Sequence, residues 1–117
     1  MAIDSAIIYT TSRNGNYYLE DNGMIICNCH FFSETTDMKD FYKMLCDEGL
    51  VAGSRADKGN VMYDFFFSVD DPKRMILIEK WESIEDLQAH SETELFQKFR
   101  PLCKANAVKS KLEMYEE

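Results

Sequence analysis

The stretch "VMYDFFFSVDDPKRMILIEKWE", residues 61–82, contains two β-prone segments separated by an acidic turn. Side chains in each segment alternate between two sets, and a period of two residues predicts a strand. Asp70-Asp71-Pro72 is typical of a tight turn. The stretch therefore predicts an antiparallel hairpin of strands 61–69 and 74–82. One face of the second strand should carry Met75, Leu77, Glu79 and Trp81.

The residues before this hairpin predict a strand and then a helix. "MIICNCHFF" (24–32) alternates as a strand, with Ile26, Asn28 and His30 on one face. After Thr36 the apolar residues follow the i, i+3, i+4, i+7 spacing of an amphipathic helix. Those residues are Met38, Phe41, Tyr42 and Leu45. The helix is expected to end near Gly49, with a possible extension to about Ser54 at some cost in helix propensity.

The residues after the hairpin predict two short helices, at about 84–90 and 92–100. Ser83 and Ser91 each have an acidic residue three positions later, which approximates the capping-box pattern. Pro101 is expected to end the second helix, because proline disrupts a helix interior.

A last strand at 107–115 completes the order β-α-β-β-α-β, which predicts an α+β, ferredoxin-like fold. In such a fold an antiparallel sheet has helices on one face, so a second copy is expected to cover the other face and form a homodimer. The domain is assigned to residues 24–117. Residues 1–23 form an N-terminal extension, in which Asn14-Gly15 predicts an extra β-hairpin over 6–20.

Charge and composition exclude several classes of partner. The chain has 117 residues and a formal net charge of −8, which disfavours nucleic acid and anionic membranes as partners. No apolar run approaches the roughly 20 residues that span a bilayer. An N-terminus without a basic segment favours a cytoplasmic protein. Four cysteines lack zinc-site spacing, so free thiols and no metal are expected at Cys27, Cys29, Cys46 and Cys103.

The hairpin and the residues after it resemble the antibiotic biosynthesis monooxygenase (ABM) family. "SRADKGN" (54–60) is also similar to the family's helix-end turn, with Asp57 where Glu is usual. The resemblance extends over residues 24–115. The residues that carry it are Tyr63, Asp70-Asp71-Pro72, Glu79-x-Trp81, Ala89-His90, Phe96 and Phe99.

The resemblance implies a dimeric α/β barrel in which each subunit encloses a pocket between its sheet and its helices. Several family members oxidise hydroquinones or anthrone-like aromatics with O2, without a metal or a flavin. By the same resemblance, this chain is expected to be a cofactor-independent monooxygenase. Its substrate would then be a small electron-rich aromatic molecule that reacts with O2 directly.

Such chemistry needs a base, a hydrogen-bond donor for the developing oxyanion and a dry apolar site. His90 is the candidate base, because an unperturbed imidazole has a pKa near 6.5. Asn28 is the second candidate catalytic residue, since an amide within an apolar strand requires a partner or a function. The expected substrate-binding residues are Tyr63, Trp81 and His30.

Each of these residues also has a structural interpretation. His90 lies between two predicted helices, where an imidazole often bonds a free backbone carbonyl. Trp81 is interpreted equally well as a core or dimer-contact residue. Glu79 is expected to pair with a Lys or Arg across the sheet.

Three alternative functions remain open at this stage. The barrel could be a non-catalytic binding or stress-response module, or an isomerase that uses the same His as a proton shuttle. Some ABM relatives degrade heme, but the position of their axial His falls at about Arg100, which cannot ligate iron.

Overall fold

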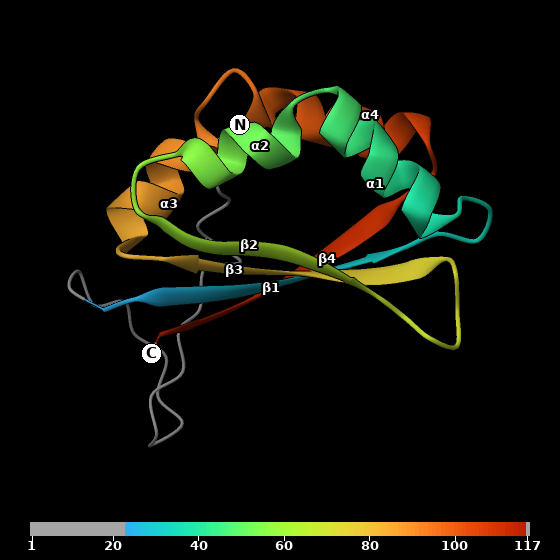
Figure 1. Cartoon of the computed structure of the whole chain (residues 1–117), viewed down its shortest axis with the longest axis horizontal. Helices are drawn as coiled ribbons and strands as arrows, with labels where there is room; N and C mark the ends of the chain where they lie inside the picture. Colours follow the sequence, from blue (N-terminus) through green and yellow to red (C-terminus); the bar gives the residue numbers. More distant parts are fainter. Residues whose placement is uncertain (1–22, 117) are drawn as a thin grey trace.

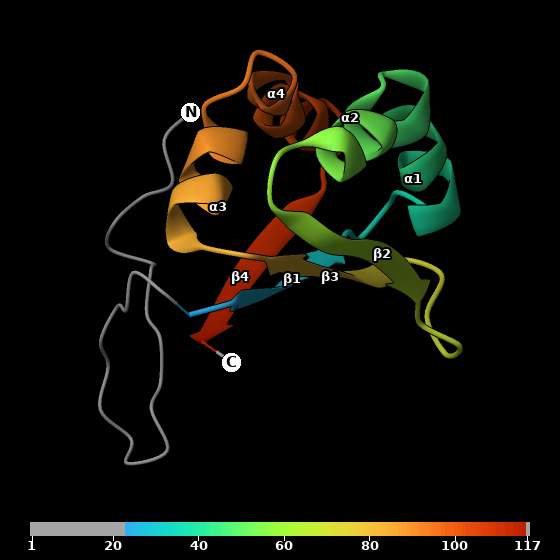
Figure 2. The same ribbon diagram turned by 60° about the vertical axis from the view of Figure 1, so that its left-hand side comes forward.

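The computed structural model describes residues 23–116, which form one antiparallel sheet with helices packed on one of its faces (Figures 1 and 2). The hairpin predicted over 6–20 lies outside the described residues. In chain order the elements are β1 (Ile25–Phe32), α1 (Met38–Asp47), α2 (Leu50–Ala56), β2 (Asn60–Phe67), β3 (Arg74–Trp81), α3 (Ile84–Ser91), the 3-10 helix η2 (Phe96–Lys98), α4 (Phe99–Ala105) and β4 (Lys109–Glu116).

The sheet has the strand order β2-β3-β1-β4, with every neighbouring pair antiparallel. The hairpin β2–β3 pairs Tyr63 with Glu79, and β1 pairs Cys27 with the same glutamate. Two β-α-β crossovers that place β1 and β3 at the centre define the ferredoxin-like fold. The fold class predicted from the sequence is confirmed.

Helix boundaries follow from local capping. The Asp37 carboxylate accepts hydrogen bonds from the backbone N–H groups of Lys39 and Asp40, at 2.8 and 3.2 Å, and so starts α1. Gly49 has φ 78°, a left-handed conformation that glycine adopts without strain, and it separates α1 from α2. Ser83 accepts from the backbone N–H of Asp86 at 3.1 Å and starts α3, as its capping pattern predicts.

Two predicted boundaries of the following helix are wrong. Pro101 lies in the first turn of α4, where a backbone N–H would have no partner within the helix, so proline is tolerated there. Ser91 is the last residue of α3, and its hydroxyl donates to the carbonyl of Gln88. The side chain that caps the next turn is Thr93, whose Oγ1 accepts from the N–H of Phe96 at 3.1 Å.

The two faces of the sheet differ in what covers them. Residues that point toward the helices define the covered face, and those of the central strands β1 and β3 are buried. The opposite face, called the open face, is free of helices within residues 23–116 (Figure 2). On β1 it carries Ile26, Asn28, His30 and Phe32, and on β3 it carries Arg74, Ile76, Ile78 and Lys80. Among the described helices, none is long and apolar enough to span a membrane.

Candidate functional site

The His90 imidazole is buried on the covered face and is held by a carboxylate. Its Nδ1 lies 2.7 Å from Oδ2 of Asp57, the C-cap residue that follows α2. The His90 side chain is 3% exposed, whereas that of Asp57 is 30% exposed. When Asp57 is ionised it accepts the Nδ1–H, and this tautomer leaves the Nε2 lone pair available as a base. His90 therefore does more than close the turn between two helices, because its bond reaches a different element of the fold.

Aromatic rings surround the imidazole. The ring centroid of His90 lies 4.6 Å from that of Trp81, 5.0 Å from Phe96 and 6.1 Å from Tyr63. Trp81 ends β3, Tyr63 lies on β2 and Phe96 begins η2. The structure thus brings together three of the predicted site residues, His90, Trp81 and Tyr63. We call this group, with Asp57 and Phe96, the His90 cluster.

A second carboxyl group, that of Glu79, lies beneath the same cluster. Its Oε1 accepts a hydrogen bond of 3.0 Å from the indole Nε1–H of Trp81. The neighbours of Glu79 across the sheet are Cys27 and Tyr63, so the expected pairing with a Lys or Arg is wrong. Alternation places Glu79 on the covered face, where the adjoining strands present apolar side chains and Tyr63.

Burial shifts the pKa values of His90 and Glu79 in opposite directions. Burial lowers the pKa of His90, although its hydrogen bond to Asp57 acts in the other direction. Burial raises the pKa of Glu79 to about 7, and the bond from Trp81 only partly offsets that rise. Near neutral pH the imidazole is therefore uncharged and able to accept a proton, while a neutral carboxylic acid is a populated form of Glu79.

Tyr63 completes the polar groups on this side of the sheet. Burial raises the pKa of the Tyr63 phenol, and the nearby Glu79 carboxylate raises it further. The phenol is therefore a hydrogen-bond donor rather than a phenolate at neutral pH. Cys27 and Cys29 share the covered face as buried thiols, and burial raises the pKa of both well above their usual value. They are therefore not nucleophilic thiolates.

The segment that carries Phe96 packs closely against α2. A Cβ atom on Gly53 would lie 2.0 Å from Cδ2 of Leu95, so a larger residue at this position would displace that side chain. Glycine inside a helix normally costs stability, and here it permits the close approach. The contact holds η2 near α2, and with it Phe96 over His90.

Asn28 and His30 lie on the open face, away from the His90 cluster. Asn28 is half-buried there between Ile78 and Glu113. His30 Nε2 forms a short hydrogen bond to Oε1 of Glu113, whose Oε2 accepts a 3.0 Å bond from the hydroxyl of Tyr115. The predicted site is thus divided: Asn28 and His30 share a face as expected, but the sheet separates them from His90 within one subunit.

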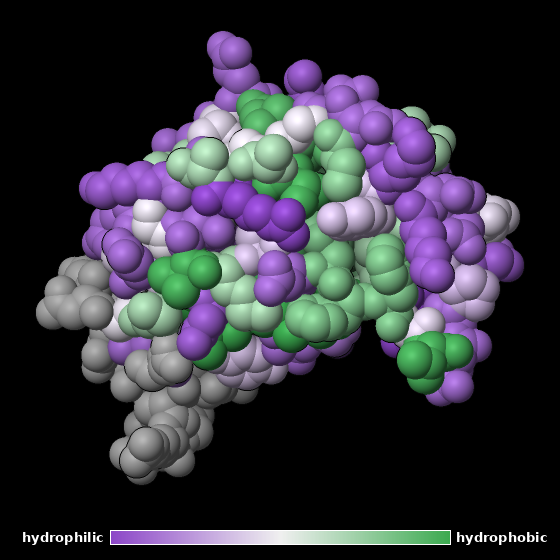
Figure 3. Space-filling model, viewed as in Figure 1, coloured by the Kyte–Doolittle hydropathy of each residue, from purple (hydrophilic) through white to green (hydrophobic). Residues whose placement is uncertain are grey.

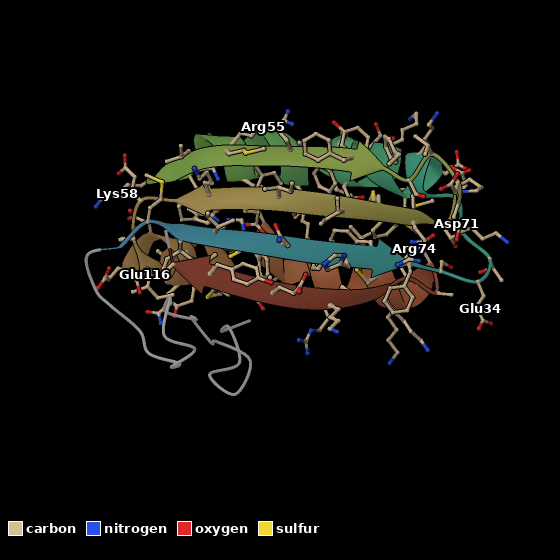
Figure 4. The ribbon with its side chains drawn as sticks, turned by 90° about the horizontal axis from the view of Figure 1, so that it is seen from below. Glu34, Arg55, Lys58, Asp71, Arg74 and Glu116 are labelled. Atoms are coloured by element: carbon tan, nitrogen blue, oxygen red, sulfur yellow. The ribbon has the colours of Figure 1, made fainter. Side chains whose placement is uncertain are left out.

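The open face carries a cavity of about 320 Å³ at the end nearest the β2–β3 turn. We call it the open-face groove. Figure 4 looks onto this face and shows Arg74 beside the tip of β1, at the end of the sheet that also carries Asp71. Figure 3 shows apolar side chains that reach the surface along the edge strand β2. The groove is lined by His30, Phe31, Phe32, Phe66, Phe67, Ser68, Arg74, Met75 and Ile76.

Some residues of these two regions were not predicted as site residues. Asp57 had a signal, since its turn resembles the helix-end turn of the ABM family. Glu79 also had one, because it alternates with Leu77 and Trp81 on an apolar face. Arg74 had none, because its position in the groove depends on the pairing of three strands. Within residues 23–116, no three His, Cys, Asp or Glu side chains converge in a way that could hold a metal ion.

These observations define an α+β protein with a ferredoxin-like sheet and a buried histidine that is hydrogen-bonded to a partly exposed aspartate. Residues 47–102 match the sequence model of the antibiotic biosynthesis monooxygenase family. The resemblance to this family that the sequence indicates is confirmed over this segment. The matched segment contains every member of the His90 cluster.

Individual relatives are similar over different lengths. A Bacillus subtilis protein named "Putative monooxygenase YcnE" is 38% identical over 52 residues, which are 44% of this chain and 55% of the relative. The match thus spans about half the length of that curated relative. A structure from Bacteroides thetaiotaomicron, described as a possible oxidoreductase, has a TM-score of 0.72 and 25% identity, and the match covers 82% of this chain and 99% of the other.

SnoaB, a cofactor-independent oxygenase from Streptomyces nogalater, is more distant in sequence. Its structure matches with a TM-score of 0.67 and 12% identity, over 79% of this chain and 90% of SnoaB. At that identity the likeness establishes a shared fold alone.

Proposed function

We propose that this chain is a cofactor-independent monooxygenase that oxidises an electron-rich aromatic substrate, such as a hydroquinone or an anthrone, with O2. The observation that carries the proposal is the buried His90 imidazole, which is hydrogen-bonded to Asp57 and packed against the Trp81 ring, whose indole in turn bonds Glu79. The match of residues 47–102 to the ABM family model and the monooxygenase name of the relative support a general role of this kind. The description of SnoaB as a cofactor-independent oxygenase agrees with it.

In this proposal His90 acts first, by taking a proton from the substrate at Nε2. The resulting carbanion or phenolate transfers one electron to O2, and the two radicals combine to form a C–O bond. Loss of water from the peroxide then leaves a carbonyl. For an anthrone, the CH2 group and O2 are thus converted to a carbonyl group and water, without an external reductant.

The other residues of the cluster hold the reacting groups. Asp57 fixes the imidazole tautomer and orientation, which makes it a positioning residue. Trp81 and Phe96 provide flat apolar walls for an aromatic ring. The Tyr63 phenol donates to a substrate oxygen. The Glu79 carboxyl supplies the proton for the departing water, because its raised pKa keeps an acid form populated near pH 7.

A homodimer and a cytoplasmic location belong to the same proposal. A second copy would cover the central part of the open face, where Ile26, Met62 and Ile78 are only half-buried in one subunit. All four cysteines are free, which suits a reducing compartment.

The test is oxygen consumption by metal-stripped protein with a panel of hydroquinones and anthrones. The chain has two histidines on opposite faces, which supply a matched pair of variants. We expect His90→Gln to lower the uptake above autoxidation by about 100-fold or more, because general base catalysis typically contributes that much. His30→Gln should retain uptake within about twofold of the wild type. No uptake with any substrate, or equal losses in the two variants, would overturn the proposal.

A further inference from the structure

The imidazole on which the proposed oxidation depends is closed off in this structure. The His90 side chain is 3% exposed, and Trp81 and Tyr63 beside it are 0% and 9% exposed. Side chains packed to this extent leave no room for a planar aromatic molecule at Nε2. One of the groups around His90 therefore has to move before a substrate can reach it.

Three of the groups around the imidazole are held by backbone hydrogen bonds to other parts of the fold. Trp81 and Tyr63 lie on strands that pair with each other, and β3 also pairs with β1 along its full length. Asp57 is fixed in a turn, where its N–H donates to the carbonyl of Ser54 at 3.2 Å and its carbonyl accepts the N–H of Asn60 at 3.1 Å. Moving any of the three would break bonds of this kind.

The fourth group, the Phe96 ring, belongs to a segment that is held mainly by packing. Residues 93–98, here called the Phe96 segment, form the loop and 3-10 turn that join α3 to α4 (Figure 1). Within residues 23–116 the hydrogen-bond donors of this segment bond only residues 90–95, so none fastens it to α2 or to the sheet. Lys98 lies 3.8 Å from Glu48, but both side chains are about half exposed, and such ion pairs contribute little to stability.

Two apolar side chains hold the segment against the fold. Phe96 lies over His90, and Leu95 lies against Gly53 of α2, where an added Cβ would be 2.0 Å from Leu95 Cδ2. Leu95 and Phe96 are half-buried, whereas Glu94 between α3 and Leu95 is exposed, as are residues 97 and 98. The segment thus has an apolar side toward the fold and a polar side toward water, and it can move as a unit without unpairing a strand.

We propose that the Phe96 segment is a lid that opens to admit an aromatic substrate to His90 and closes through the contact of Leu95 with Gly53. When the lid opens, the Phe96 ring leaves the imidazole, and the ring of the substrate takes its place. Closure over the bound substrate then excludes water from the reacting carbanion. The identity of the substrate rests on the proposed oxidation, whereas opening of the lid is a property of the chain and is measured without turnover.

Access to His90 is measured with diethyl pyrocarbonate, which modifies uncharged imidazoles, followed by mass spectrometry of the peptide that carries the residue. Leu95→Ala should speed modification of His90 by about 5- to 30-fold, because the closed state loses the packing that holds it. Leu102→Ala is the matched control, since Leu102 is also half-buried against the core but lies on α4, outside the lid. It should leave the rate at His90 within about twofold of the wild type.

A reversible crosslink tests the closed state directly. A Cβ at Gly53 would lie 3.5 Å from Cγ of Leu95, so Gly53→Cys combined with Leu95→Cys brings two sulfurs within reach of a disulfide. Cys46→Ser in the same protein removes the exposed thiol. The disulfide should slow modification of His90 by about 10-fold or more and stop oxygen uptake with an anthrone, and reduction should restore both.

The outcomes separate the lid from the oxidation. Equal rates at His90 in Leu95→Ala and the wild type would overturn the lid, as would a crosslinked protein whose His90 reacts as fast as after reduction. Oxygen uptake that persists in the crosslinked protein but is lost in His90→Gln would also overturn the lid and would leave the oxidation standing. Modification that the crosslink blocks, without oxygen uptake in any of the proteins, would support the lid and reject the oxidation.

Discussion

The two histidines of this chain each bond a carboxylate, one on each face of the sheet, and the difference between them comes from burial. His90 on the covered face is 3% exposed at its side chain, whereas His30 on the open face is 38% exposed. Burial lowers the pKa of His90 in spite of its Asp57 partner. On the open face, water screens the charges, and the bond from His30 lowers the pKa of Glu113 instead.

The same pairing of residue types therefore has two different consequences. On the covered face burial keeps His90 neutral and keeps the carboxyl group of Glu79, the partner of Trp81, partly protonated. This arrangement is suited to proton transfer. On the open face the charged form of Glu113 is favoured, an arrangement suited to recognition of polar partners. Substitutions of the same residue type on the two faces measure how much the faces differ in burial and in protonation.

The largest expected effect is on folding stability, from two adjacent phenylalanines. Phe31 is 1% exposed and its ring contacts those of Phe41, Phe65 and Phe99. Phe31→Ala should lower the free energy of unfolding by about 3–5 kcal/mol, since it opens a cavity in the core. Phe32→Ala, on the open face, should cost less than about 1 kcal/mol.

Urea unfolding of the two variants and the wild type at one protein concentration measures this difference. Comparable losses would mean that Phe32 is as well packed as Phe31 in solution. The two faces would then not differ in burial, and an open face would be a wrong description of the protein.

The next effect is on the pH dependence of stability, and it concerns Glu79. Its pKa is about 7 in the folded chain and near 4.5 when unfolded, so the folded state binds more protons between these values. The Glu79 contribution therefore lowers stability as pH rises from about 4.5 to 7, by about 3 kcal/mol in total. Gln at this position keeps an acceptor for the Trp81 indole and removes the titration. Glu79→Gln should therefore gain stability relative to the wild type as pH rises through this window.

The quantity to measure is the difference in the free energy of unfolding between Glu79→Gln and the wild type at each pH. In the wild type alone, His90 changes stability with pH in the opposite direction to Glu79. The lowered pKa of His90 makes its contribution to stability fall as pH drops below 6.5, and this cancels in the difference. Glu113→Gln is the matched control on the open face. The pKa of Glu113 is lowered in the folded chain, so Glu113→Gln should lose stability relative to the wild type as pH rises.

The fluorescence of Trp81 gives a second measurement of the same titration. This residue is the single tryptophan of the chain, and its indole N–H donates to Glu79. A fluorescence change with a midpoint near pH 7 should be present in the wild type and absent in Glu79→Gln. A midpoint that persists in the variant would assign the titration to another group and contradict the account of Glu79.

The sequence predicted the elements of this fold well because their signals are local. Alternation in 24–32 correctly placed Asn28 and His30 on one face, and the capping pattern at Ser83 located the start of α3. Pro101 was misassigned because proline suits a first helical turn as well as it ends a helix, and only the path of the chain before it decides.

The candidate site was predicted less well because it depends on which face the helices cover. Alternation states which residues share a face, not what lies against it. The purely apolar set on β1, with Ile25, Cys27 and Phe31, was the available signal for the covered face. That signal would have separated Asn28 from His90. It would also have drawn attention to Glu79, an acid on a face that is otherwise apolar on its own strand.

The smallest expected effect comes from Asn28, the residue predicted as catalytic that the structure places away from His90. The sheet separates its side chain from the His90 cluster, so within one subunit it cannot contact the same bound substrate. Asn28→Ala should lower oxygen uptake by less than about threefold, and it should change the free energy of unfolding by less than about 1 kcal/mol. A loss as large as that of His90→Gln would mean that oxidation takes place on the open face. His90 would then affect the reaction only through the stability of the fold.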